Sequence, residues 1–136
     1  MSAVKNFKHP IRIYYEDTDF SGVVYHAAYL KFLERARTEA LRAIEVHHHE
    51  LLERDEPLAF AIRKMTTHWL APARIDDLLE VRTQFGDVRG ARFFLSQEIW
   101  RDDVLLIRAE VEAACMTLGG RPRRLPPEIL LAITGP

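Results

Sequence analysis

The residues best suited to chemistry lie in one segment, Tyr14–Glu39. Three acidic residues, Glu16, Asp17 and Asp19, stand before a glycine and a short apolar run, and His26 follows at the start of a predicted helix. A carboxylate beside a helix N-terminus suits hydrolysis, because it can act as base or nucleophile while free N–H groups of the first turn hold a developing oxyanion. Taken singly, each of these residues is more typical of a tight turn or of a helix cap.

A metal site is the first alternative for the acidic loop. The pattern at 17–22 resembles the start of a calcium-binding EF-hand loop, but the twelfth position is Ala28 instead of a bidentate glutamate, and no predicted helix precedes the loop. For a transition metal, the three consecutive histidines at 47–49 cannot converge on one ion from a helix, so we interpret them as a solvated helix end. We therefore predict neither a metal nor a bound cofactor.

A serine or cysteine nucleophile is the second alternative. Ser21 lacks the G-x-S-x-G elbow, and nothing in the sequence around Ser96 would activate its hydroxyl. Cys115 falls on the apolar face of a patterned strand, where a small core side chain is the simplest interpretation. The carboxylate is therefore the preferred reactive group.

Length and composition indicate one globular domain covering residues 1–136. The chain is 48% hydrophobic and 29% charged, with a net charge of −1 that offers no general field for nucleic acid. A single cysteine cannot form an internal disulfide and fits a reducing compartment, so we expect a cytoplasmic protein. No apolar run approaches the roughly 18 residues that span a bilayer, and we expect no membrane insertion.

Apolar periodicity predicts one strand, one long helix and then four strands. Alternation with period two predicts strands at 9–15, 58–70, 78–88, 92–101 and 105–117. A three- to four-residue repeat predicts a helix from 27 to about 47, Asp102 and Asp103 form a predicted turn, and a last helical turn is predicted at 128–133. This order predicts an α+β fold in which an antiparallel sheet wraps around the helix, and the open sheet edges favour pairing with a second copy.

One long motif resembles a known family. The pattern Y-E-D-T-D-x-x-G-V-V-Y-H-x-x-Y-L-x-F-x-E-x-A-R-T-E at 15–39 closely resembles the signature of hotdog-fold acyl-CoA thioesterases of the 4-hydroxybenzoyl-CoA thioesterase superfamily, in the YbgC-type branch found beside the bacterial Tol–Pal system. The segments Ala71–Thr83 and Gly119–Pro127 resemble later landmarks of the same family. The resemblance implies a hotdog fold with about five strands around one long helix. It also implies a homodimer or homotetramer with its active cleft between two subunits.

The resemblance implies roles for individual residues. Asp19 matches the catalytic aspartate, which acts as base or nucleophile, His26 matches the histidine that positions the carbonyl, and Tyr15 matches a supporting tyrosine. Asp17 is assigned to the hydrogen bonds of the loop itself. Phe20 departs from the smaller residue that the family pattern leads us to expect, which bears on acyl preference and not on the reaction.

The implied function is hydrolysis of an acyl-CoA thioester to free acid and coenzyme A. Arg121, Arg123 and Arg124 are candidates to bind the phosphates of coenzyme A, and they are equally typical of a solvated basic tail. Two alternatives are a hotdog dehydratase acting on 3-hydroxyacyl thioesters and a non-catalytic module that binds acyl thioesters or acyl carrier protein. Coenzyme A and acyl carrier protein both stay open as the carrier, and the Tol–Pal link is an analogy.

Overall fold

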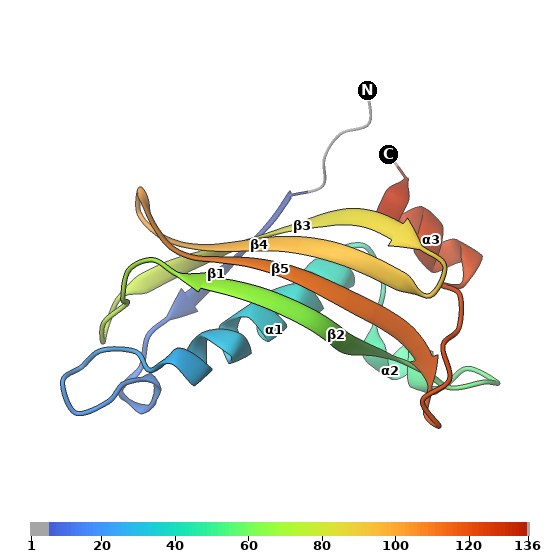
Figure 1. Ribbon diagram of the computed structural model, residues 1–136, viewed down its shortest axis with the longest axis horizontal. Helices are drawn as coiled ribbons and strands as arrows, with labels where there is room; N and C mark the ends of the chain where they lie inside the picture. The colour runs from blue at the N-terminus through green and yellow to red at the C-terminus, as the bar shows by residue number, and fades with distance from the viewer. Residues whose placement is uncertain (1–5, 136) are drawn as a thin grey trace.

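The computed structural model describes residues 6–135, which form one antiparallel sheet and three α-helices. The elements in chain order are β1 (Asn6–Arg12), the 3₁₀ turn η1 (Tyr15–Asp17), α1 (His26–Ala43), α2 (His48–Leu52), β2 (Leu58–Trp69), β3 (Leu78–Arg89), β4 (Arg92–Arg101), β5 (Val104–Thr117) and α3 (Pro127–Thr134). The strands lie in the order β1-β3-β4-β5-β2, and the sheet arches over α1 (Figure 1). The predicted α+β hotdog architecture is therefore confirmed.

The alternation predicted for the last strand is present in β5. Its apolar residues at 107, 109, 111, 113 and 115 are all at most 2% exposed, whereas Arg108 and Glu110 are exposed on the other face. The predicted turn also lies between β4 and β5, where Asp102 adopts a φ of 52°. Aspartate tolerates this left-handed backbone better than most residues, because its short side chain can hydrogen-bond locally. Cys115 is fully buried and unpaired, as expected of a core side chain.

α1 buries the apolar stripe that the sequence predicts, but it ends earlier than expected. Tyr29, Phe32 and Leu33 are at most 1% exposed, and the stripe continues to Leu41. The helix stops at Ala43 because the backbone N–H of Val46 donates to the carbonyl of Leu41 at 2.9 Å while Glu45 adopts a φ of 63°. This left-handed cap closes the last turn and directs Val46, 6% exposed, into the core.

The predicted helix end at the three histidines is consequently wrong. His47 precedes α2 and His48 opens it, so the cluster starts a second short helix. Only 16% of the His47 side chain is exposed, and its Nε2 lies 3.3 Å from the Glu45 carboxylate. The interpretation of the cluster as a solvated helix end therefore fails for this residue.

The first strand is displaced from its prediction toward the N-terminus. Regular pairing with β3 ends at Arg12, after which the backbone of Ile13 bonds to Asp76 and Asp77 in the connection between β2 and β3. The chain then turns through η1, which leaves Tyr15 outside the strand that was predicted to include it and 75% exposed. At the other terminus, the predicted helical turn is confirmed within α3, whose Ile129 packs into the core beneath the sheet.

Candidate active site

The loop between η1 and α1 is held by its own hydrogen bonds. The Asp17 carboxylate accepts a bond from the backbone N–H of Tyr14 at 2.9 Å, which confirms its predicted role within the loop. The N–H of Asp19 donates to the carbonyl of Val23 at 2.9 Å, and the N–H of Gly22 donates to the carbonyl of Asp19 at 3.2 Å. Gly22 has a φ of 80°, a conformation open to glycine at little cost, so the glycine allows this tight reversal.

Asp19 presents one fixed and one free carboxylate oxygen. Its Oδ1 accepts bonds from the Ser21 N–H at 2.8 Å, the Ser21 hydroxyl at 2.6 Å and the Val23 N–H at 3.4 Å. Within residues 6–135, no donor is bonded to Oδ2. The hydroxyl bond from Ser21 is the main cause that lowers the pKa of Asp19 below its ordinary value. The side chain is therefore an oriented, exposed and ionised carboxylate at neutral pH.

The start of α1 supplies unpaired backbone donors beside this loop. The helix begins at His26 without a side-chain cap, and the N–H of Ala28 is occupied by the carbonyl of Tyr25 at 3.0 Å. Among the described residues, no acceptor is bonded to the N–H groups of His26 or Ala27. Together with the positive end of the helix dipole, these groups can stabilise an oxyanion.

A pocket of about 230 Å³ adjoins the helix start. His26 and Tyr29 of α1 line one side, and Trp69 with residues 70–72 lines another. The imidazole of His26 lies against the Trp69 indole, with ring centroids 5.0 Å apart. Sequence reasoning missed Trp69, because the only local signal was an aromatic residue at a strand end.

The connection from β2 to β3 clamps the acidic loop onto α1. The N–H of Val24 donates to the carbonyl of Ala73 at 3.0 Å, and the N–H of Ile75 donates to the carbonyl of Gly22 at 2.9 Å. The hydroxyl of buried Tyr29 accepts a bond from the Ala73 N–H at 2.8 Å, while burial raises the pKa of this tyrosine. The segment that matched the second landmark of the family pattern thus holds the loop in place.

The structure brings some predicted site residues together and separates others. Asp19 lies in the loop between η1 and α1, and His26 opens the helix that follows; this loop is at the left end of Figure 1. The carbonyl of Tyr15 accepts bonds from Thr18, but its side chain is exposed and forms no hydrogen bond within residues 6–135. A supporting role for the Tyr15 ring stays a prediction.

The three C-terminal arginines lie at the other end of the molecule. The loop that carries Arg121, Arg123 and Arg124 follows β5 at the right of Figure 1, so one chain does not place them beside the acidic loop. Arg123 forms a two-pronged ion pair with Glu56, at 2.9 and 3.2 Å. Their contact with coenzyme A stays a prediction.

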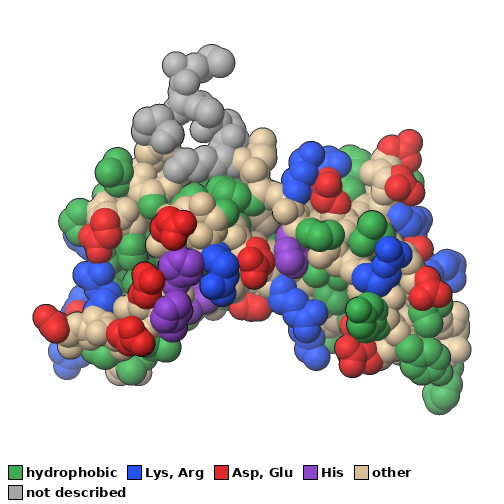
Figure 2. Space-filling model, turned by 180° about the vertical axis from the view of Figure 1, so that it is seen from behind, with side chains coloured by type: hydrophobic (Ala, Val, Ile, Leu, Met, Phe, Trp, Pro, Cys, Tyr) green, Lys and Arg blue, Asp and Glu red, His purple; other side chains and the backbone are tan. Residues whose placement is uncertain are grey.

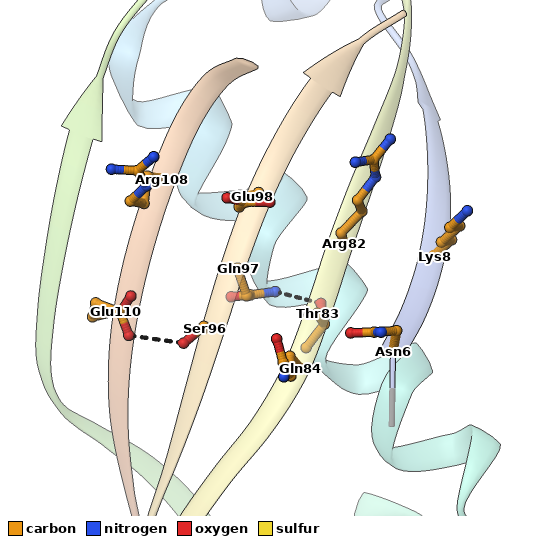
Figure 3. A pocket seen from close by; sticks show the side chains of 10 residues that line it. All are labelled: Asn6, Lys8, Arg82, Thr83, Gln84, Ser96, Gln97, Glu98, Arg108 and Glu110. Atoms are coloured by element: carbon orange, nitrogen blue, oxygen red, sulfur yellow. Dashed lines mark hydrogen bonds between the residues drawn. The ribbon is translucent and has the colours of Figure 1, made fainter. Parts of the chain in front are cut away.

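Another pocket, lined by polar side chains, lies on the outer face of the sheet. It has a volume of about 430 Å³ and is lined by side chains of β1, β3, β4 and β5 (Figure 3). Here the hydroxyl of Ser96 donates to the Glu110 carboxylate at 2.9 Å, a partner that the sequence around Ser96 did not indicate. The pair is exposed on the strand surface and lacks the oriented backbone donors found at the start of α1.

The structure also bears on nucleic-acid binding, metal binding and membrane insertion. On the face shown in Figure 2, basic and acidic side chains are interspersed, without the basic patch that nucleic acids bind. Among the described residues, histidine, cysteine and acidic side chains do not gather in groups of three or more that suit a metal ion. The helices within residues 6–135 include none with the length and apolar character needed to cross a membrane.

Comparison with known proteins identifies the family. The chain is 47% identical over 128 residues to the acyl-CoA thioester hydrolase YbgC of Escherichia coli O6:H1, covering 91% of this chain and 92% of the relative. It is 43% identical over 127 residues to the acyl-CoA thioesterase YbgC of Haemophilus influenzae, covering 93% of each. A probable thioesterase from Bartonella henselae has a similar structure, with a TM-score of 0.84, 44% identity and coverage of 91% of this chain and 100% of the other. The sequence model of the thioesterase-like superfamily matches residues 14–133, and the chain therefore belongs to this superfamily.

Proposed function

We propose that this protein is an acyl-CoA thioesterase that hydrolyses an acyl-CoA thioester to a free acid and coenzyme A. The observation that carries the proposal is the placement of Asp19. One of its oxygens is fixed by Ser21 and Val23, its other oxygen is free, and unpaired donors at the start of α1 belong to the same loop region. The names of the closely similar YbgC proteins support the same reaction.

The reaction assigns a task to each part of the site. The thioester carbonyl oxygen accepts bonds from the N–H groups of His26 and Ala27, which stabilise the negative charge of the tetrahedral intermediate. Asp19 either removes a proton from the attacking water or attacks the carbonyl carbon to form an anhydride that water then cleaves. In both routes the C–S bond breaks and the thiolate of coenzyme A leaves. The His26 ring, supported by Trp69, orients the acyl thioester.

The proposal is tested by thiol release from acyl-CoA substrates. Asp19→Asn keeps the shape of the side chain and removes its charge, so we expect kcat to fall by about 10²–10⁴. Asp17→Asn is the matched control, because an amide oxygen can still accept the Tyr14 N–H bond, and it should keep kcat within about ten-fold. Unchanged thiol release by Asp19→Asn would contradict the assignment. An enoyl thioester formed without free thiol would indicate a dehydratase.

Assembly and location belong to the same proposal. We expect a homodimer or homotetramer, because β1 and β2 are open sheet edges and large apolar side chains near the site are exposed. These side chains are Tyr14, Tyr15, Phe20, Tyr25 and Leu70. Light scattering of the purified protein gives the subunit number, and a monomer would refute this part. The single buried thiol fits a cytoplasmic location, and a role beside the Tol–Pal system is proposed from the YbgC relatives alone.

A further inference from the structure

The inner face of β2 is only partly covered by α1. Phe60, Ile62, Met65, Thr67 and Trp69 stand opposite buried residues of β5, and directly opposed residues share a face of a sheet, so all five face inward. Nevertheless, Ile62 is 45% exposed and Trp69 43%. The reason is that the backbone of α1 lies nearest to β1 and β3, toward the opposite edge of the sheet. A strip of half-exposed side chains, here called the β2 strip (62, 65, 67 and 69), therefore runs along β2.

The β2 strip begins at the candidate active site and ends at a second pocket. Trp69 lines the pocket beside His26, while Ile62 lines another pocket of about 100 Å³ at the far half of α1. Phe60, Phe93 and Leu95 line this far pocket, and the two phenylalanine rings meet edge to face at 5.0 Å. A cavity of about 150 Å³ lined by comparable side chains holds benzene, so about 100 Å³ suits a few terminal carbons of a chain.

The polar rim of the far pocket is held by its own hydrogen bonds. The Thr38 hydroxyl has one hydrogen, which it donates to Glu34 at 3.0 Å, so the Nε2 of His48 at 3.2 Å must be the donor to Thr38. Arg37 donates to the side-chain oxygen of fully buried Gln97 at 3.1 Å. These bonds hold the rim side chains to one another and to the core.

We infer that the far pocket binds the terminal carbons of a long acyl chain whose thioester lies at the start of α1. This inference rests on the proposed function and names its substrate class. At a rise of 1.5 Å per residue, Glu34 lies about 12 Å along α1 from His26 and Thr38 about 18 Å. An extended chain advances about 1.2 Å per bond, so roughly 10–15 bonds cover this distance. The substrate class is therefore saturated acyl groups of about 12–16 carbons, lying along the β2 strip.

The test is thiol release from a series of saturated acyl-CoA esters, from butanoyl to hexadecanoyl. Each buried methylene adds up to about four-fold to kcat/KM, so the wild-type rate should rise with chain length. Ile62→Trp fills the far pocket at a half-exposed position, and it should lower kcat/KM for tetradecanoyl-CoA by at least about ten-fold while butanoyl-CoA changes by less than about two-fold. Lys64→Trp is the control, because Lys64 is exposed on the outer face of β2, opposite Glu112 of β5 in the sheet register, and its substitution should leave the whole series unchanged.

Two results would overturn the inference while the proposed function stands. One is thiol release that does not depend on chain length. The other is an Ile62→Trp variant that loses activity equally on all esters and changes its mass in light scattering, because the β2 strip would then be covered by a second copy. Calorimetric measurement of tetradecanoate binding separates the proposed acyl-binding pocket from the proposed hydrolysis. If no ester is cleaved but tetradecanoate binds the wild type and not Ile62→Trp, the pocket is supported and the proposed hydrolysis fails.

Discussion

Removal of the Tyr29 hydroxyl tests the clamp that holds the acidic loop. In Tyr29→Phe, the ring stays in its packed position and only the acceptor of the Ala73 N–H bond at 2.8 Å is lost. Tyr29 is 1% exposed and Ala73 is fully buried, so solvent does not replace the hydroxyl. The carbonyl of Ala73 holds Val24, which means that the loss acts directly on the loop carrying Asp19.

The magnitude follows from one unsatisfied buried donor. Such a group costs about 1–3 kcal/mol of the free energy of unfolding. At about 2.1 cal/mol/K per residue, a chain of 136 residues has an unfolding entropy near 0.29 kcal/mol/K, so Tm should fall by about 3–10 °C. A shift of the loop should also lower kcat/KM by about three- to ten-fold, because small displacements of catalytic groups are costly.

Thermal unfolding by calorimetry and thiol release together measure both effects. Tyr25→Phe is the matched control, since this neighbouring tyrosine is 41% exposed and its hydroxyl forms no hydrogen bond among the described residues. We expect the control to keep Tm within about 2 °C. A Tyr29→Phe variant with the Tm of the wild type would refute the reasoning, because the Ala73 N–H would then have found another acceptor at no cost.

Two further predictions concern single side chains. Ser21→Ala removes the bond that contributes most to the lowered pKa of Asp19, so that pKa should rise toward its ordinary value. Because the ionised carboxylate is the active form, the acid limb of the pH profile of kcat/KM should move to higher pH, and an unmoved limb would contradict the prediction. Burial raises the pKa of the Cys115 thiol, so the native protein should react with a thiol reagent only on unfolding. Rapid labelling of the folded protein would show that the strand opens locally.

Sequence periodicity predicted those elements whose signals are local. The alternation in β5 and the stripe of α1 depend on neighbours two to four residues apart, and both are present. The end of α1 had no such signal, because Glu45 takes the left-handed cap position where glycine is usual. What ends the helix is the burial of Val46, which depends on packing against distant segments.

The same distinction applies to the site. Asp19 and His26 stand in one short segment, so a motif could place them together before any fold was known. Trp69 and Ala73 join them only because the connection from β2 to β3 returns to the start of α1. The sequence was equally consistent with Arg123 as a ligand of the coenzyme A phosphates and as part of a solvated basic tail. Its ion pair with Glu56 had no local signal, because Glu56 lies far from Arg123 along the chain.

The position of α1 under the sheet explains why the functional features gather along one edge. The backbone of α1 lies nearest to β1 and β3, and the inner side chains Leu79 and Val81 of β3 are at most 1% exposed. β2 is the opposite edge, where inner side chains such as Ile62 stay half exposed although they are apolar. A helix centred under the sheet would have buried β2 and closed the pocket beside His26. The off-centre helix therefore places an open apolar surface directly beside its own positively polarised N-terminus, which is the combination that an apolar acyl thioester requires.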